Sequence, residues 1–246
     1  MAPGFAAYRT FLMACAAAFA ASCGQKASPD TVAPETKQQS AAPTATGAPI
    51  TPVATEAPAG DYRLDKSHAS LVFKVNHIGY SNYTGAFDSL AASLAFDPAA
   101  PEKMRVTATI DVGSLDIPAP PEGFLEELKS AAWLNAIDFP AMTFRSTAVT
   151  LTGPNSARID GELDFRGVTA PVALDAVFNG GYAGFPPYDP NARIGFSTTG
   201  ALKRSVFGVL AGIPTPEAPV GVGDEVTFEI EAEFTGPPTQ AGAKPQ

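Results

Sequence analysis

Residues 225–234 read Glu-Val-Thr-Phe-Glu-Ile-Glu-Ala-Glu-Phe, an unbroken alternation of polar and apolar side chains. A β-strand sends successive side chains to opposite faces, so one face of this segment is apolar and the other is polar. The apolar face carries Val226, Phe228, Ile230, Ala232 and Phe234. The pattern therefore predicts a strand with one face in water and the other against an apolar interior.

Seven further segments show strand patterns, separated by connections rich in Gly, Pro and Asn. They span 71–77, 90–96, 105–112, 142–152, 159–165, 172–178 and 194–198. One stretch, 121–134, instead places Phe124, Leu125 and Leu128 at helical spacing and predicts a short helix. Eight antiparallel strands with one apolar face each form either a closed barrel or a two-sheet sandwich, and the pattern alone does not decide between them.

The first 22 residues contain one charge, Arg9, followed by an apolar run that is too short to span a bilayer. This arrangement is typical of an export signal, so we expect residues 1–22 to be a signal peptide. The sequence Ala20-Ala-Ser-Cys23 resembles the site at which bacterial lipoproteins are cut and acylated. We therefore expect Cys23 to be lipidated and the protein to be periplasmic, anchored to the outer membrane; an ordinary cleavable signal is the alternative.

Residues 23–60 are rich in Pro, Ala and Thr and contain no aromatic residue, so we expect a disordered tether. The folded domain is predicted over 61–236, and a flexible tail over 237–246. Both cysteines of the chain, Cys15 and Cys23, lie at or before the cleavage site, which leaves the domain without a thiol for a disulfide or a metal. Two histidines make a weak case for a metal site, and we predict none.

The chain is acidic, with a net charge of −9 that becomes −10 once residues 1–22 are removed. A protein of this charge without Lys and Arg clusters is poorly suited to a phosphate backbone, so nucleic acid is excluded as an expected partner. The sequence leaves open whether the protein forms a homodimer.

Several blocks between residues 62 and 226 resemble the YceI-like family of bacterial periplasmic proteins. They are Tyr62-Arg-Leu-Asp65, Ser70 to Gly79, Gly85-Ala-Phe87, Asp138 to Ser146, Gly161 to Val172, Arg193 to Phe196, Lys203 to Gly208 and Val222 to Val226. The resemblance covers nearly all of 61–236, and the blocks 166–171 and 204–208 are its most specific part. It implies a lipocalin-like antiparallel β-barrel whose interior holds an isoprenoid chain, as a polyprenyl lipid or a quinone, with no other cofactor.

This resemblance turns the inward-facing side chains into candidate ligand contacts. The candidates are Phe73, Val75, His77, Phe87, Phe144, Phe165, Phe196, Arg204, Phe228 and Ile230. From alternation alone the apolar residues among them are equally expected to pack a filled interior. His77 is read either as a hydrogen-bond donor near the pocket mouth or as a histidine bonded to backbone. Arg204 either binds a head group or braces turns through carboxylates such as Asp224.

Three functions follow from this sequence. The first is an exported, non-enzymatic protein that holds an isoprenoid lipid for carriage or storage. The second is a barrel enzyme that acts on an apolar substrate with His77 as its base. The third is an envelope protein with a structural or stress-response role and a dry, packed interior.

Overall fold

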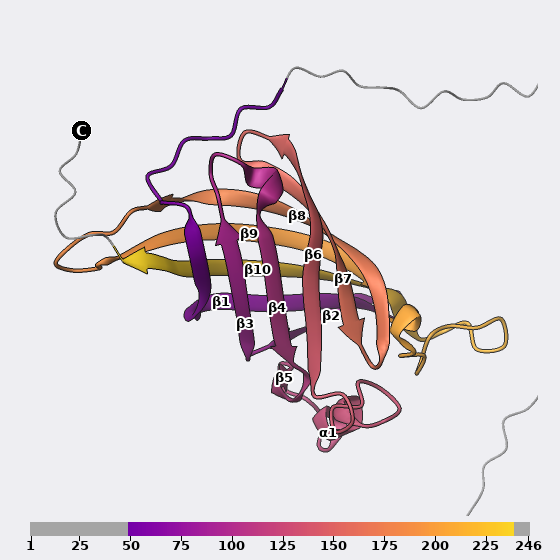
Figure 1. Cartoon of the computed structure of the whole chain (residues 1–246). Coiled ribbons are helices and arrows are strands. Elements are labelled where there is room, and N and C mark those ends of the chain that lie inside the picture. Colours follow the sequence, from indigo (N-terminus) through magenta and orange to yellow (C-terminus); the bar gives the residue numbers. More distant parts are fainter. Residues whose placement is uncertain (1–48, 239–246) are drawn as a thin grey trace, which may run out of the picture. The chain divides into compact units, whose positions relative to one another are not determined.

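The computed structural model describes residues 49–238 and shows an all-β domain in which ten strands form one antiparallel sheet (Figure 1). The strands are β1 (Gly60–His77), β2 (Ser81–Phe87), β3 (Leu90–Phe96), β4 (Arg105–Asp111), β5 (Leu115–Asp116), β6 (Ala141–Gly153), β7 (Ser156–Phe165), β8 (Val168–Tyr182), β9 (Asn191–Lys203) and β10 (Val222–Pro238). Three 3₁₀ turns and one helix complete the described part.

Eight of these strands close into a barrel because the last strand pairs with the first. The ring runs β10-β9-β8-β7-β6-β4-β3-β1 and returns to β10, with Phe73 of β1 opposite Phe228 of β10. The eight predicted strands are these eight staves, so the predicted eight-stranded antiparallel barrel is confirmed. Closure leaves fewer exposed strand edges than a sandwich would.

Strands β2 and β5 were not predicted, and they extend the wall at one end of the barrel. The first four residues of β1 pair with β3, whereas residues 72–77 pair with β2. Strand β1 therefore changes its neighbour halfway along, and Figure 1 shows that it bends between these two runs. Strand β5 adds a two-residue ladder to the outer edge of β2.

The alternation in β10 sorts its side chains as expected. Phe234 is 5% exposed, whereas Glu229 and Glu231 lie on the outer surface. Glu229 accepts a hydrogen bond from Lys74 of the neighbouring β1 at 2.9 Å, across the outer face of the wall. The other face of the same strand borders the interior.

The predicted helix is present as α1 (Phe124–Lys129), within the long connection between β5 and β6. It follows Gly123, whose φ of 74° lies in the left-handed region that glycine tolerates. None of its six residues is fully buried. It lies at the same end of the barrel as the connections 78–80, 166–167 and 204–221, because these all follow or precede the same ends of antiparallel strands (Figure 1).

The opposite end of the barrel holds a segment that the sequence placed in the tether. Residues 49–59 are described, and Val53 donates its N–H to Pro154 O at 2.7 Å. Ala57 is buried at 2% exposure, and the Tyr62 hydroxyl donates to Pro58 O at 2.8 Å. These eleven residues, which the sequence placed in the tether, are thus attached to the barrel through backbone hydrogen bonds and the buried Ala57, although most of their side chains are exposed.

The other termini fall partly outside the described residues. Strand β10 continues to Pro238, two residues beyond the predicted end of the domain. The predicted signal peptide, the lipidation site Cys23, residues 23–48 of the tether and residues 239–246 of the tail lie outside the described residues.

An ion-pair cluster joins β1 to β9 near the end of the barrel that holds residues 49–59. Arg193 donates from its Nη1 to Asp65 Oδ2 at 2.5 Å and from its Nε to Asp189 Oδ2 at 2.6 Å. Asp65 also accepts from Ser67 Oγ at 2.6 Å. Hydrogen bonds from Ser67, Arg193 and His68 hold the pKa of Asp65 well below its usual range. The cluster fixes the irregular bend of β1 that follows Leu64.

Candidate ligand cavity

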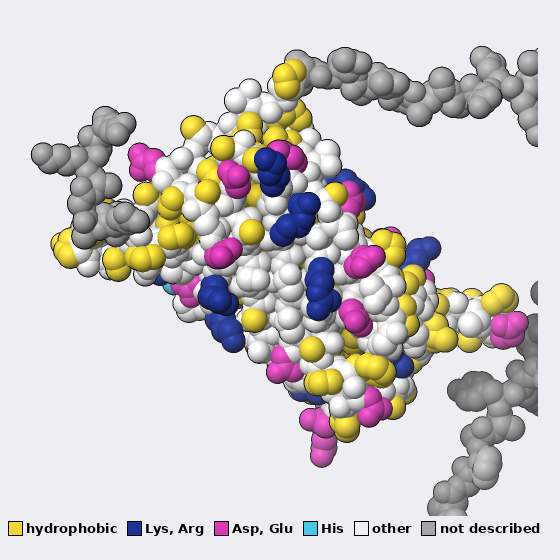
Figure 2. All heavy atoms as spheres, viewed as in Figure 1, with side chains coloured by type: hydrophobic (Ala, Val, Ile, Leu, Met, Phe, Trp, Pro, Cys, Tyr) yellow, Lys and Arg dark blue, Asp and Glu magenta, His cyan; other side chains and the backbone are white. Residues whose placement is uncertain are grey.

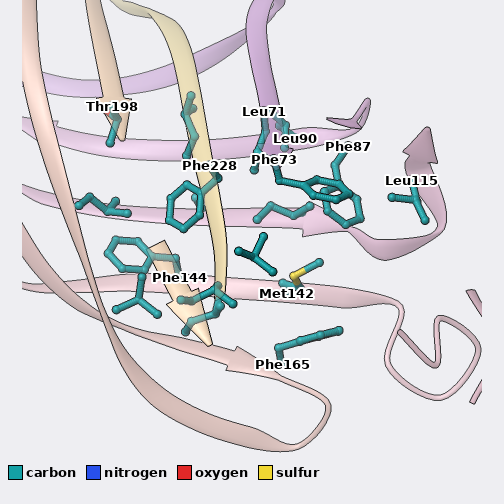
Figure 3. A pocket seen from close by; sticks show the side chains of 18 of the residues that line it. Leu71, Phe73, Phe87, Leu90, Leu115, Met142, Phe144, Phe165, Thr198 and Phe228 are labelled. Carbon is teal, nitrogen blue, oxygen red and sulfur yellow. The ribbon is translucent and has the colours of Figure 1, made fainter. Parts of the chain in front are cut away.

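The inward faces of the barrel strands enclose a cavity of about 480 Å³ (Figure 3). Its volume falls within the range of about 300–1,000 Å³ that is typical of small-molecule sites. Apolar side chains from opposite walls, among them Leu71, Met142 and Phe165, point toward this common space in Figure 3. The interior of the barrel is therefore not filled by its own side chains.

The cavity is long rather than round. Its lining on β10 begins at Val222 and ends at Phe234, and a strand rises about 3.3 Å per residue, so it follows roughly 40 Å of strand. On β1 it likewise extends from Leu64 to His77. A volume of this size distributed over such a length fits an extended chain better than a compact molecule.

One end of the cavity is closed by aromatic rings. Tyr62 packs edge-to-face on Phe96 at 5.3 Å, and Phe96 lies 6.0 Å from Phe178. Phe196 continues the cluster, 5.3 Å from Phe178 and 6.1 Å from Phe234. Tyr62 has no exposed surface, and burial raises the pKa of its hydroxyl to about 12. We call this cluster the closed end.

The other end is where the lining side chains reach solvent, and we call it the mouth. It is formed by His77, Tyr83, Phe124, Leu128 and Trp133, which are all lining residues and none of which is fully buried. The ring of Tyr83 contacts that of Phe124 edge-to-face at 6.3 Å, so the β1–β2 hairpin touches α1 across the mouth. Here the lining also contains polar atoms.

Three lining phenylalanines lie against glycines on neighbouring strands. The pairs are Phe73 with Gly85, Phe144 with Gly161, and Phe228 with Gly200. A Cβ placed on Gly200 would lie 2.5 Å from Cζ of Phe228, which is far inside van der Waals contact. Each glycine therefore leaves room for a ring to lie flat along the wall instead of projecting across the cavity.

Small side chains widen the middle of the cavity. Ala92 of β3 lies opposite Ala108 of β4, and Ala176 of β8 lies opposite Thr198 of β9. All four residues line the cavity. Thr198 places a hydroxyl in a part of the lining that is otherwise apolar (Figure 3). Because alternation alone does not show where a cavity is widest, the sequence did not single out these residues.

Arg204 is buried at 7% exposure beside the mouth, and its partners are backbone carbonyls. Four of the five N–H groups of a guanidinium are engaged here. The acceptors are Gly223 O at 2.8 Å, Val209 O at 3.0 Å, Ala211 O at 2.7 Å and Val222 O at 2.9 Å. The guanidinium also lies over the Trp133 ring at 5.4 Å. Burial lowers its pKa, and the Asp224 charge raises it.

This geometry revises the two interpretations of Arg204. Asp224 does not bond to the guanidinium; it accepts hydrogen bonds from Ser205 N at 2.9 Å and Ser205 Oγ at 2.8 Å. Arg204 thus braces the connection 204–221 through carbonyls, not through a carboxylate. Its hydrogen-bond donors are directed at the loop, so head-group binding by Arg204 would require those bonds to break.

All ten candidate residues line the cavity. The rings of Phe73 and Phe87 contact each other at a tilt, with centroids 5.6 Å apart, whereas Phe196 lies at the closed end. His77 lies at the mouth, with its ring 6.1 Å from that of Tyr83. Whether these residues contact a ligand stays a prediction. Tyr83 and Trp133 were missed because one lies on an unpredicted strand and the other in an irregular connection.

The described residues lack the features of two other kinds of site. Residues 49–238 contain no group of three or more His, Cys, Asp or Glu side chains arranged to hold a metal ion. In the same residues, no helix has the length and apolar character needed to cross a bilayer.

A closed antiparallel barrel around an apolar, elongated cavity defines a lipocalin-like binding fold. The model of the YceI-like domain matches residues 62–234, which are nearly all of the described part. The chain therefore belongs to the YceI-like family, as its sequence blocks indicated.

Relatives matched over most of their own length support this membership. A UPF0312 protein of Pseudomonas savastanoi pv. phaseolicola is 32% identical over 185 residues, which are 74% of this chain and 89% of the relative. A UPF0312 protein of Azotobacter vinelandii is 37% identical over 158 residues, covering 63% of this chain and 80% of the relative.

Solved structures share the fold. The YCEI protein of Campylobacter jejuni is similar with a TM-score of 0.55 and 26% identity, over 66% of this chain and 90% of that protein. BcnA of Burkholderia cenocepacia has a TM-score of 0.58 and 23% identity, over 69% of this chain and 98% of that protein. A polyisoprenoid binding domain from Saccharophagus degradans has a TM-score of 0.54 and 15% identity, over 72% and 98% of the two chains.

Proposed function

We propose that this protein binds a long isoprenoid chain inside its barrel and holds it for carriage or storage. The observation that carries the proposal is the elongated apolar cavity, which follows β10 from Val222 to Phe234. Family membership and the fold shared with a polyisoprenoid binding domain support the same ligand class.

The energetics favour a chain in this cavity. Burying one methylene group contributes about 0.8 kcal/mol, so a tail of several isoprene units supplies ample free energy. Part of that gain is offset by ordering of the flexible chain. Affinity therefore comes from the tail, and the few polar groups at the mouth are left to discriminate between head groups.

The cavity also separates this proposal from its alternatives. A structural protein with a dry, packed interior has no need of an elongated cavity of about 480 Å³. The enzyme hypothesis rests on His77, whose ring lies at the mouth, 6.1 Å from the Tyr83 ring. The cavity thus supports binding over a packed interior.

We further propose that binding takes place in the periplasm, with the protein held at the outer membrane through Cys23. The support is the sequence of residues 1–23, which combines a short apolar run with a lipoprotein-like cleavage site. A lipid anchor would keep a carrier of apolar cargo close to a membrane from which the cargo is drawn.

The test of binding is extraction of the purified protein with organic solvent, followed by mass spectrometry. We expect masses that differ by isoprene units or belong to isoprenoid quinones. Trp133 is the only tryptophan of the chain and lines the mouth, so its fluorescence reports titration with an added isoprenoid quinone. Recovery of no isoprenoid, together with no saturable change in Trp133 emission, would overturn the proposal.

A further inference from the structure

The charge around the mouth limits which head group the cavity accepts, and this inference rests on the proposed isoprenoid binding. Among the described residues that line the cavity, Arg204 is the one with a formal charge. The other polar members are His77, Tyr83, Thr109, Trp133 and Thr198. The lining therefore offers hydrogen-bonding groups but only one cation.

The guanidinium of Arg204 is not free to bind an anionic head group. The Arg204 guanidinium donates four hydrogen bonds to carbonyls of residues 209–223. It also lies over the ring of Trp133. Burial lowers the pKa of this guanidinium, and the charge of the nearby Asp224 raises it. A phosphate that recruited this guanidinium would leave one buried and three partly buried carbonyls without donors, at a cost of up to roughly 1–3 kcal/mol for the buried one.

The connections around the mouth add negative charge. Residues 78–80, 112–140, 166–167 and 204–221 contain six acidic and three basic side chains. The acidic ones are Asp116, Glu122, Glu126, Glu127, Asp138 and Glu217, and the basic ones are Lys129, Arg166 and Arg204. Figure 2 shows acidic side chains near α1 and a single acidic group near the tip of the long loop that precedes β10.

Arg166 is already counted in this balance, which stays negative with its charge included. Its guanidinium donates to Trp133 O and lies within 3.5 Å of Ala131 O, so it braces the connection that follows α1. A head group with one or two negative charges would thus enter a field of the same sign, and the guanidinium that lines the cavity already has four of its five N–H groups bonded to carbonyls. A neutral oxygen meets no such repulsion and can accept a hydrogen bond from Tyr83 or His77.

We propose that the mouth selects isoprenoids with a neutral polar head group, of the quinone or alcohol class, over isoprenoid phosphates and diphosphates. Tail burial is common to all these ligands, so the preference arises at the mouth alone. Selection of this kind comes from repulsion of the wrong ligand as much as from contacts with the right one.

The test compares a polyprenol with the monophosphate of the same polyprenol, so that the tails are identical. Both compete with an isoprenoid quinone for the full-length protein, and Trp133 emission reports displacement. At low ionic strength we expect the alcohol to compete at least about tenfold better than the phosphate. Equal or better competition by the phosphate overturns the inference while leaving isoprenoid binding intact. If neither competes and the quinone does not bind, the proposed function itself fails, and the inference fails with it.

Two charge-reversal variants, one at the mouth and one at the other end of the barrel, test whether the preference for a neutral head group originates at the mouth. Glu127 is exposed on α1 beside the lining residue Leu128. Glu127→Lys is expected to improve competition by the phosphate roughly threefold at low ionic strength and to leave the alcohol unchanged. Glu102 is exposed at the other end of the barrel, so Glu102→Lys makes the same charge change away from the mouth. An equal effect of both substitutions would refute a local origin of the preference.

Discussion

The ring of Phe228 in β10 lies directly against the backbone of Gly200, its cross-strand neighbour in β9. A Cβ at position 200 would meet Cζ and Cε2 of that ring at 2.5 and 2.8 Å. Phe73 and Gly85 repeat the relationship between β1 and β2. The absence of a side chain on one strand thus sets how far an aromatic side chain on the next strand projects into the cavity.

Gly200→Ala is therefore predicted to push the Phe228 ring into the cavity. We expect the affinity for an isoprenoid quinone to fall about tenfold or more, because the displaced ring occupies space that the chain needs. Trp133 fluorescence titration measures the affinity. Gly195→Ala is the matched control on the same strand, since a Cβ there meets only Asn179 Cβ at 3.9 Å. Unchanged affinity in folded Gly200→Ala protein would show that Phe228 does not limit the cavity.

Arg204→Met tests whether this residue acts as a brace. The substitution removes four hydrogen bonds to the carbonyls of the connection 204–221 and the start of β10. We expect the free energy of unfolding to fall by about 3 kcal/mol, because buried carbonyls lose their donors. Urea denaturation measures the change. A variant with unaltered stability but lost ligand binding would instead assign Arg204 to the head group.

The cluster around Asp65 makes a prediction about pH. Asp65→Asn is expected to lower the free energy of unfolding at pH 7 by roughly 1–3 kcal/mol, because charge-assisted bonds to Ser67 and Arg193 are weakened. The native-state pKa of Asp65 lies below its unfolded value of about 4. Its contribution is thus full above that value and is lost as the pH falls toward the native-state pKa.

The measurement is urea denaturation of both proteins from pH 7 down to pH 3. The difference in stability between wild type and Asp65→Asn should persist to about pH 5 and shrink below pH 4. Asp61→Asn on the same strand is the control, since Asp61 is exposed. A difference that stays constant down to pH 3 would show that ionisation of Asp65 is not its source.

The lipidation site is tested by growth with labelled palmitate. The wild-type protein is expected to carry the label, and Cys23→Ser is expected to lose it and to leave the membrane fraction. Cys15→Ser, in the apolar run of the predicted signal, should keep the label. Label in the Cys23→Ser protein would contradict acylation at this residue.

Much of the barrel could be predicted from the sequence, because half-buried strands impose a period of two on their side chains. The eight segments with this pattern became the eight staves. Strand β2 escaped prediction because Gly85 interrupts its apolar alternation, and in the structure the ring of Phe73 occupies the space where a side chain would lie. Residues 49–59 escaped because their composition is that of a linker, and only contacts with Pro154 and other parts of the barrel fix them.

The candidate cavity was predicted as a set of inward-facing residues, and an interior open to a ligand was implied only by the family resemblance. The sequence by itself determined which side chains face inward, because alternation is a local property of each strand, and its family-specific blocks pointed to the barrel. Only the tertiary structure decided that β1 meets β10, that Phe228 lies flat on Gly200, and that Arg204 is committed to carbonyls of the loop. These features depend on strands brought together across long stretches of chain, so no local pattern encodes whether the interior is filled or hollow.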